Sequence, residues 1–251
     1  MKLIFILLLT VILTGCFVTP PPIIEGKYYF FGVGICDYQD TCDNDLTAPT
    51  WAVDDIRELF EKHYDFEVMA VLKDYQASKE NVLNTMWYTF KDATKDDVCI
   101  FYWAGHGTTN ALLTYDMQYL AVNEIQYFLD KIEAEKIMII DACHSGSFIG
   151  KVVPKLFNEE GYQVITSTVG DDVCYQVGAT SFSDPYMVFT KGILEGFNEL
   201  FFYYLADKNK DKIVTMTEVY DYAVDWVSEY FYKEQNAQIY PEGSQFPMII
   251  Y

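Results

Sequence analysis

The chain alternates between short apolar runs and longer segments in which apolar residues recur at helical spacing. The short runs are apolar almost throughout, which is typical of strands buried on both faces of a sheet. Five such strands are predicted: Tyr28–Ile35, Phe66–Leu72, Val98–Trp103, Lys136–Asp141 and Tyr162–Thr168.

Helices are predicted between and after these strands. Asn123–Gln126 has the sequence of a capping box, and Asp184-Pro185 has the cap-then-proline order that begins a long helix. Strands that alternate with helices predict an α/β fold, in which a mainly parallel central sheet is flanked by helices on both faces. The clearest helical stripes lie within Ala52–His63, Leu83–Phe90 and Ile125–Ile132.

The amino-terminal segment is a targeting signal in this interpretation. Lys2 precedes an apolar run, Leu3–Leu13, that is too short for a membrane-spanning helix. The run ends in Leu-Thr-Gly-Cys16, which resembles the lipobox of bacterial lipoproteins. That resemblance implies a signal peptide over residues 1–15, a lipidated Cys16 with a tether over 16–26, and a folded domain over 27–251. The alternative is an ordinary secretory signal that happens to contain a cysteine.

Composition limits the partners. The net charge is −20, so nucleic acid is excluded as a partner and anionic lipid head groups are repelled. Contact with a membrane is therefore expected through the lipid anchor only, in the bacterial cell envelope, while cationic proteins or peptides are favoured as partners. Of the six cysteines, Cys36 and Cys42 flank a polar loop and could form a disulfide in an exported protein. No cysteine or histidine pair has the spacing of a zinc site.

The residues best suited to chemistry follow the third and fourth strands. The third strand runs into Gly105-His106-Gly107, and the fourth runs into Cys143. Because the carboxyl ends of parallel strands meet at one rim, the imidazole and the thiol are expected to face each other. A thiol with an ordinary pKa near 8.5 needs such a partner to become a nucleophile at neutral pH. Either motif alone also fits a buried cysteine or a simple turn; the two together favour catalysis.

These two motifs resemble those of a known family. Trp103-Ala-Gly-His106-Gly and Asp141-Ala-Cys143-His-Ser-Gly146 are similar to the catalytic motifs of caspase-like cysteine peptidases, and closest to metacaspases. The resemblance implies a caspase-like three-layer sandwich, a His106/Cys143 dyad, and an oxyanion site formed by the backbone N–H groups of Gly107 and Cys143. No cofactor is required for such chemistry. Weaker similarity to the family lies at Ala52–Asp55, Leu112–Asp116, Phe189-Thr190 and Gln245–Pro247.

The resemblance also bears on the substrate. Caspases bind an acidic P1 side chain with arginines, whereas this chain has one arginine, Arg57, within a predicted helix. In metacaspases the residue matching Asp141 lies in the S1 pocket, which implies cleavage after Arg or Lys, with Asp55 as a second S1 residue. The alternative is that Asp141 only braces the end of its strand. His144 is a rival base that we expect to shape the loop, and His63 is expected to be a packed or surface residue.

A second candidate site lies near the carboxyl end of the chain. A twelve-residue loop that begins at Asp207 has oxygen donors in the positions of an EF-hand calcium loop. Lys212, however, occupies the position where glycine permits the sharp turn, and an acidic connector is the alternative. The predicted calcium ligands are Asp207, Asn209, Asp211, Thr215 and Glu218.

Three functions fit these observations. The first is a cysteine endopeptidase that hydrolyses peptide bonds. The second is a catalytically inactive lipoprotein of the same fold that binds a peptide or a protein, and the third is a transpeptidase that uses the same acyl-enzyme. The presence of both His106 and Cys143 favours an enzyme.

Overall fold

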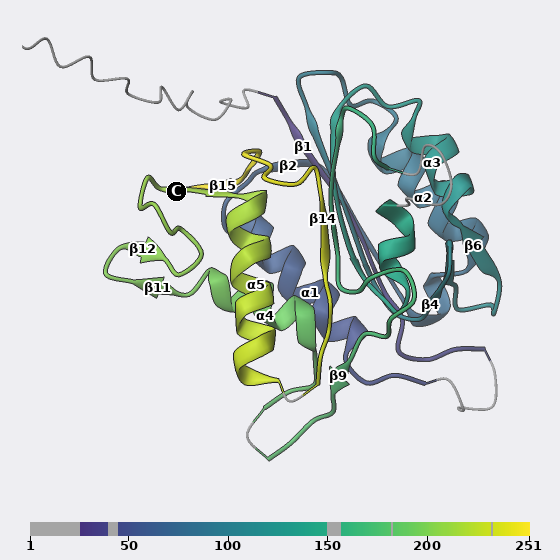
Figure 1. Ribbon diagram of the computed structural model, residues 1–251. Helices are drawn as coiled ribbons and strands as arrows, with labels where there is room; N and C mark the ends of the chain where they lie inside the picture. Colours follow the sequence, from purple (N-terminus) through teal and green to yellow (C-terminus); the bar gives the residue numbers. More distant parts are fainter. Residues whose placement is uncertain (1–25, 40–44, 150–156, 182, 232) are drawn as a thin grey trace, which may run out of the picture.

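The computed structural model describes residues 26–39, 45–149, 157–181, 183–231 and 233–251 (Figure 1). A six-stranded sheet with the strand order β14-β8-β7-β3-β1-β2 forms its centre. Neighbouring strands are parallel except at the edge, where β14 runs antiparallel to β8. The bounds are β1 (Tyr28–Gly34), β2 (Phe66–Lys73), β3 (Val98–Ala104), β7 (Glu135–Asp141), β8 (Tyr162–Thr166) and β14 (Gln238–Tyr240).

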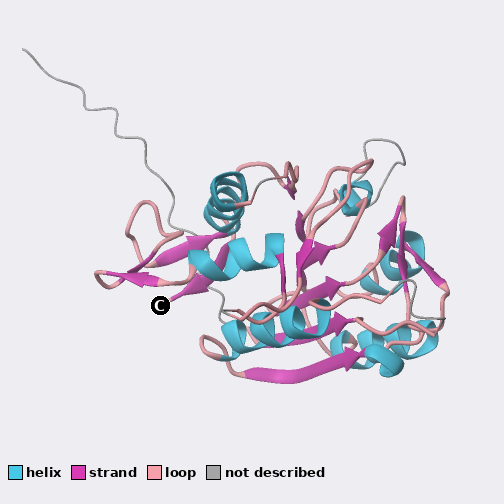
Figure 2. Ribbon diagram, turned by 90° about the horizontal axis from the view of Figure 1, so that it is seen from below, coloured by secondary structure: helices cyan, strands magenta, loops and turns pink. Residues whose placement is uncertain are grey.

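Helices cover both faces of this sheet, which confirms the predicted three-layer α/β architecture (Figures 1 and 2). One face carries α1 (Pro49–Glu61), α4 (Val188–Gly196) and α5 (Met216–Tyr230). The other carries α2 (Lys79–Phe90) and α3 (Val122–Leu129).

The apolar strands follow from this two-sided burial. Phe30 of β1 and Tyr102 of β3 lie in the core beneath α1, α4 and α5, whereas Phe31 and Phe101 lie in the core beneath α2 and α3. All four side chains are buried. Because successive side chains of a strand point to opposite faces, a strand covered on both faces must be apolar at every position.

Two predicted helix starts are wrong. The helix α3 begins at Val122, and Glu124 accepts the backbone N–H of Ala121 at 2.9 Å, so the N-cap is Ala121, two residues before Asn123, and only the glutamate half of a capping box forms. The helix α4 begins at Val188, not at Asp184-Pro185, because Tyr186 and Met187 first form a short strand. Residues that favour the start of a helix also favour turns, so the pattern alone does not fix where the helix begins.

Short strands outside the main sheet were not predicted. β4 (Gly107–Thr108), β5 (Ala111–Leu113) and β6 (Tyr119–Ala121) form a small sheet directly after His106. Three antiparallel pairs complete the described part of the chain: β9 (Gln176–Val177) with β10 (Tyr186–Met187), β11 (Glu199–Leu200) with β12 (Tyr203–Tyr204), and β13 (Ile213–Thr215) with β15 (Pro247–Ile250). Two 3₁₀ helices, η1 (Asp74–Gln76) and η2 (Ser145–Ile149), lie after β2 and β7.

The targeting segment lies outside the described residues, together with the proposed lipidation site Cys16 and most of the tether. Within the described part of the chain, no helix combines the length and the apolar character needed to cross a membrane.

Candidate active site

The register of the sheet brings the two predicted catalytic segments together. β3 and β7 are paired residue by residue up to Ala104 and Asp141, and His106 and Cys143 each follow two residues later. Gly107 then approaches the Cys143 segment so closely that a Cβ atom there would lie 2.6 Å from the Cys143 carbonyl oxygen. Glycine is therefore required at position 107, and the two loops are in contact at the rim, as the sequence predicted.

His106 is positioned by Tyr38, a residue that no motif of the sequence singled out. The backbone N–H of His106 donates to the Tyr38 hydroxyl at 2.8 Å, and the two rings lie 5.0 Å apart between centroids. Tyr38 is 4% exposed, and burial raises the pKa of its hydroxyl. The histidine itself is half-buried. Its carbonyl oxygen accepts the N–H of Leu113, which ties it to the small sheet.

The Cys143 thiol is half-buried and lies beside a second cysteine. Its Sγ atom is 3.8 Å from the Sγ atom of Cys174 and accepts the backbone N–H of Cys174 at 3.4 Å. Hydrogen bonding from Cys174 lowers the pKa of the Cys143 thiol to about 6, although burial acts in the opposite direction. The same interaction and burial raise the pKa of Cys174 well above its ordinary value. The interaction between the two thiols therefore favours the thiolate form at Cys143 and not at Cys174.

The segment after Cys143 is fixed by the loop that follows β8. The backbone N–H of buried Ser145 donates to Thr168 Oγ1 at 3.0 Å. His144 donates its N–H to the Asp172 carbonyl and has its ring Nδ1 3.3 Å from the Gly170 carbonyl. His144 thus joins the two loops, which is the role expected for it.

Asp141 lies beneath the rim, fully buried. Its Oδ2 atom accepts the Thr190 N–H at 3.1 Å and the Thr190 hydroxyl at 2.8 Å, so it links β7 to the first turn of α4. Its Oδ1 atom is buried without a hydrogen bond of normal geometry, although the nearby Ser167 hydroxyl also acts to lower the pKa of this carboxyl. Burial raises the pKa of this carboxyl to about 6. The alternative that Asp141 braces the end of its strand thus accounts for Oδ2. It leaves Oδ1 without a hydrogen bond of normal geometry.

Asp55, the second predicted S1 residue, lies on the exposed side of α1. Partial burial of its carboxyl and the charge of Glu58 raise its pKa. The charges of Asp141 and Asp55 both act on the hydroxyl of buried Tyr102, whose pKa burial raises most. The two carboxylates are therefore both near enough to act on the hydroxyl of this tyrosine.

Other loops complete the rim. Gln176 accepts the backbone N–H groups of Thr47 and Ala48 through Oε1, at 2.9 and 3.0 Å, and so links β9 to the start of α1. Gln235 accepts the Tyr175 N–H and donates to the Ser167 carbonyl. None of these residues was singled out from the sequence, because each acts through a contact between distant loops.

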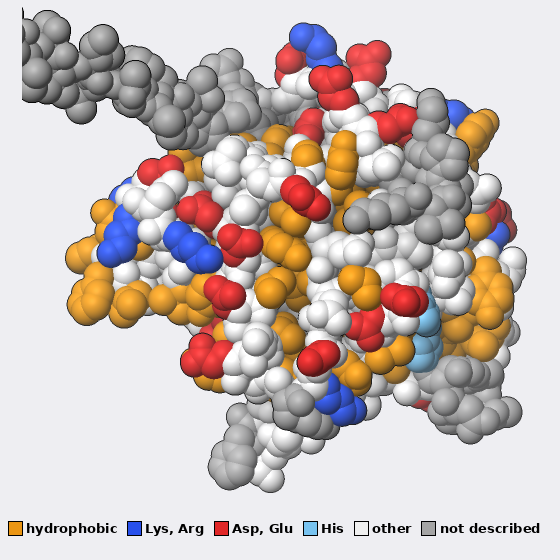
Figure 3. Space-filling view, viewed as in Figure 1, with side chains coloured by type: hydrophobic (Ala, Val, Ile, Leu, Met, Phe, Trp, Pro, Cys, Tyr) orange, Lys and Arg blue, Asp and Glu red, His pale blue; other side chains and the backbone are white. Residues whose placement is uncertain are grey.

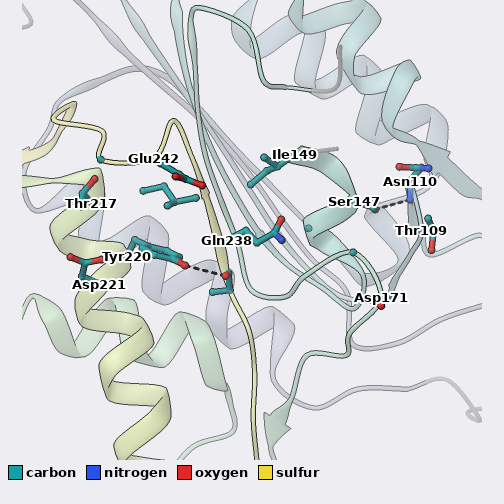
Figure 4. Close-up of a pocket in the computed structure, with 15 residues that line it drawn as sticks. Thr109, Asn110, Ser147, Ile149, Asp171, Thr217, Tyr220, Asp221, Gln238 and Glu242 are labelled. Atoms are coloured by element: carbon teal, nitrogen blue, oxygen red, sulfur yellow. Dashed lines mark hydrogen bonds between the residues drawn. The ribbon is translucent and has the colours of Figure 1, made fainter. Parts of the chain in front are cut away.

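A cavity of about 800 Å³ lies next to these loops (Figure 4). Asn110 and Ser147 line one side, where the Asn110 N–H donates to Ser147 Oγ at 2.8 Å. Tyr220 lines the other side and donates to the Ala237 carbonyl. The carboxylates that line the cavity are those of Asp171, Asp221 and Glu242.

The predicted calcium loop is arranged differently from a metal site. The carboxylate of Asp207 is buried and accepts the N–H of Lys212 at 3.0 Å and the hydroxyl of Tyr251 at 2.8 Å. Glu218 accepts the N–H and hydroxyl of Thr215 and so caps α5. Among the residues that the structure describes, no three His, Cys, Asp or Glu side chains are grouped to hold a metal ion. The acidic-connector alternative describes this geometry better than the calcium interpretation.

The remaining candidate residues have structural partners. Cys36 is a free thiol whose Sγ atom lies 3.2 Å from Thr50 Oγ1, and Cys42 lies outside the described residues. His63 lies 3.1 Å from the Tyr204 hydroxyl through Nε2, and burial lowers its pKa. It is a packed residue, as expected.

Comparisons with known proteins agree with this architecture. The family model described as the caspase domain of Peptidase_C14 matches residues 33–223. Caspase-1 from Spodoptera frugiperda is similar in structure, with a TM-score of 0.62 and 13% identity, covering 88% of this chain and 90% of that one. Protein GSU0716 from Geobacter sulfurreducens has a TM-score of 0.61 and 14% identity, covering 85% of this chain and 92% of that one. The search of curated proteins found no match.

Proposed function

The chain belongs to the caspase-domain family, and from this premise we propose that it is a cysteine endopeptidase with Cys143 as nucleophile and His106 as acid–base partner. The observation that carries the proposal is the register of β3 and β7. Their last pair is Ala104 with Asp141, and His106 and Cys143 each follow two residues later. The lowered pKa of Cys143 supports it, because the thiolate is the attacking species.

The proposed reaction has two steps. The Cys143 thiolate attacks the carbonyl carbon of the scissile bond, and the backbone N–H groups of Gly107 and Cys143 donate to the oxygen on which negative charge develops. His106 then protonates the leaving amine. In the second step His106 removes a proton from water, which hydrolyses the thioester and restores the thiol.

We further propose that the peptide is cut after Arg or Lys. The Oδ1 atom of Asp141, which lacks a hydrogen bond of normal geometry, would receive a cationic P1 side chain, and this would require a movement that opens the buried carboxyl. Arg57, the only arginine, is engaged with Asp54, Glu58 and Glu61 on α1, so it is not available to bind an acidic P1 group. The carboxylates of the adjoining cavity would favour basic peptides in the same way.

The proposal includes attachment to a membrane of the bacterial cell envelope through a lipidated Cys16. The lipobox-like sequence supports it. Intact mass measurement of the protein extracted from membranes tests it, because a diacylglyceryl group at Cys16 and the loss of residues 1–15 change the mass together. An unmodified Cys16 contradicts the anchor and leaves the peptidase proposal intact.

The decisive experiment compares wild type with Cys143→Ala. We expect wild type to cleave fluorogenic peptides with Arg or Lys at P1 and to react with a thiol-directed probe at Cys143. The variant should lose turnover by at least about a thousandfold. Cleavage only after Asp would refute the S1 assignment alone.

Two alternatives are outcomes of the same experiment. A folded wild type that binds peptides without turning them over would identify a catalytically inactive binding module. Aminolysis products in the presence of an added amine would identify a transpeptidase, because the acyl-enzyme would then be transferred and not hydrolysed.

A further inference from the structure

The hairpin β11–β12 carries an exposed aromatic tip. Phe201 and Phe202 form the two-residue turn between its strands, and each is 83% exposed. Leu200 beside them is 54% exposed. Two neighbouring phenylalanines exposed to this degree have no packing role in the folded chain, which is typical of an interaction surface.

The backbone of this tip is unusual for phenylalanine. Phe201 has φ of 51° and Phe202 has φ of 77°, so both lie in the left-handed region that Asn-Gly normally occupies in such turns. Residues in this region point to function when the fold gives no other reason for them.

The tip belongs to the end of the molecule opposite the catalytic rim. The rings of Tyr204 in β12 and Tyr251 lie 4.2 Å apart, and β15 precedes Tyr251 directly. The Met248 carbonyl in β15 accepts the Tyr64 hydroxyl, and Tyr64 stacks on Tyr28, the first residue of β1. A continuous series of contacts therefore joins the hairpin to the amino ends of the central strands (Figures 1 and 2).

Lysines lie beside the tyrosine rings at the base of the hairpin, although the chain is strongly acidic and Lys62 also lies 3.8 Å from Glu199 of β11. Lys210 lies 5.8 Å from the centre of the Tyr203 ring, Lys212 lies 6.0 Å from that of Tyr251, and Lys62 lies 5.5 Å from that of Tyr204. Figure 3 shows hydrophobic side chains gathered at the hairpin, with Lys side chains next to them. Aromatic rings beside lysines match the composition of the membrane–water interface.

We propose that Phe201 and Phe202 insert into the interfacial region of a lipid bilayer, with Lys62, Lys210 and Lys212 at the level of the head groups. This inference goes beyond the peptidase proposal and rests in part on the proposed anchor. The ten residues from Cys16 to Glu25 span at most roughly 35 Å, and they lead to Gly26, next to the start of β1 at the same end. The hairpin is thus a local exception to the repulsion that the overall charge predicts, and the catalytic rim faces away from the membrane.

Photo-cross-linking tests this docking. The photoreactive analogue p-benzoylphenylalanine replaces Phe201 in the full chain, which is produced in bacteria and irradiated in isolated membranes. The matched control carries the analogue at Tyr75, which is 72% exposed in η1 near the catalytic rim. Mass spectrometry of the digested chain should show lipid adducts at position 201 with a yield roughly tenfold above that at position 75.

Equal yields at the two positions, or adducts to protein alone at position 201, would overturn the proposal. The mass of the Cys16 peptide is read from the same digest. A lipidated Cys16 without lipid adducts at position 201 refutes the docking and leaves the anchor standing. Lipid adducts at position 201 without lipid on Cys16 support the docking and refute the anchor.

A different observation carries a second inference. The Sγ atoms of Cys143 and Cys174 lie 3.8 Å apart, within reach of a disulfide after a small rotation of the side chains. Cys174 is bound to the rim through its own backbone N–H, and the next residue is held by Gln235. We infer that peroxide oxidises this pair to a disulfide that reversibly blocks the proposed nucleophile.

The proposed oxidation proceeds through a sulfenic acid at Cys143. The Cys143 thiolate attacks one oxygen of hydrogen peroxide, which gives a sulfenic acid and releases hydroxide. The Cys174 thiol then condenses with the sulfenic acid, so that an S–S bond forms and water leaves. The two electrons pass from the sulfur atoms to peroxide, and a dithiol reductant restores both thiols.

Peptide mapping of the peroxide-treated full chain tests the disulfide without an activity assay. We expect a Cys143–Cys174 cross-linked peptide that dithiothreitol removes, in wild type and in the control Cys36→Ser. Cys174→Ser should accumulate sulfinic acid at Cys143 instead. Sulfinic acid at Cys143 in wild type, with Cys174 still reduced, would overturn the inference. Because the inferred disulfide uses the thiol of the proposed active site, peptidase activity is measured separately in untreated protein.

Discussion

The rim that carries His106 and Cys143 and the loop that begins at Asp207 are both polar sites that the sequence singles out. They differ in whether their polar atoms are already hydrogen-bonded within the fold. At the rim, Asp141 Oδ1 is buried without a hydrogen bond of normal geometry and the Cys143 thiol is half-exposed. In the loop, Asp207 and Glu218 accept hydrogen bonds from backbone N–H groups and hydroxyls of their own surroundings. Polar capacity left unused in the first region is available for a ligand, whereas in the second it already stabilises the fold.

The largest expected effect tests the rim. His106→Gln should lower turnover by about 10²- to 10⁴-fold, because the proposed acid that protonates the leaving amine is removed. Alkylation of Cys143 by iodoacetamide at pH 7 should change little, since the hydrogen bond from Cys174 is the largest cause of the lowered pKa of that thiol. Rates of peptide cleavage and of alkylation are measured side by side. Loss of both in parallel would mean that His106 sets the thiolate, and His63→Gln, at the histidine packed on Tyr204, is the control.

The next effect tests the loop. Asp207→Ala should lower the free energy of unfolding by about 3 kcal/mol, because buried N–H and hydroxyl groups lose their charged acceptor. Urea denaturation with and without calcium should give the same difference. Tyr251→Phe is the milder control and should lose about 1 kcal/mol. A stability change that calcium enlarges would restore the metal interpretation.

A third effect concerns Asp141. Its pKa in the folded chain is about 6, above the ordinary value of 3.8, so the folded protein holds the proton more tightly than the unfolded chain. The free energy of unfolding should therefore fall as the pH rises from about 4 to about 6, by roughly 2 kcal/mol. Asp141→Asn should remove this dependence and lose preference for basic P1 residues. Parallel stability curves for the two proteins between pH 4.5 and pH 7.5 would contradict it.

The smallest effect is expected for a change in the stability of the Asp207 loop. Lys212 has φ of 68°, in the region that glycine adopts without a steric penalty. Lys212→Gly should raise the free energy of unfolding by about 0.5 kcal/mol, since relief of strain exceeds the added entropy of the unfolded chain. Lys210→Gly, at φ of 61°, is a matched variant. A decrease in stability would show that the Lys212 side chain contributes more through the Tyr251 ring than its backbone strain removes.

The sequence predicted the strands β1, β3, β7 and β8 because they are buried on both faces and are therefore apolar almost throughout. It predicted β2 from its apolar run, although this edge strand is only partly buried. It did not predict β14, since Gln238–Tyr240 has no apolar run and pairs only along one edge. His106 and Cys143 could be found because strand ends are recognisable in sequence. Tyr38 and Cys174 could not, because each reaches the site by a contact between segments far apart in the chain. Thr190 was noted only for its similarity to the family, and its contact with Asp141 was not predicted for the same reason.

The pairing of β3 with β7 has a consequence for changes in chain length. The two strands match pair by pair from Val98 with Glu135 to Ala104 with Asp141. One residue inserted between Asp141 and Cys143 would displace the thiol by about 3.3 Å and turn it to the other side of the backbone. The same insertion in the turn at exposed Glu160, ahead of β8, would leave this alignment intact. The number of residues between the end of each strand and His106 or Cys143 therefore cannot change on one strand alone, whereas a surface loop elsewhere can become longer.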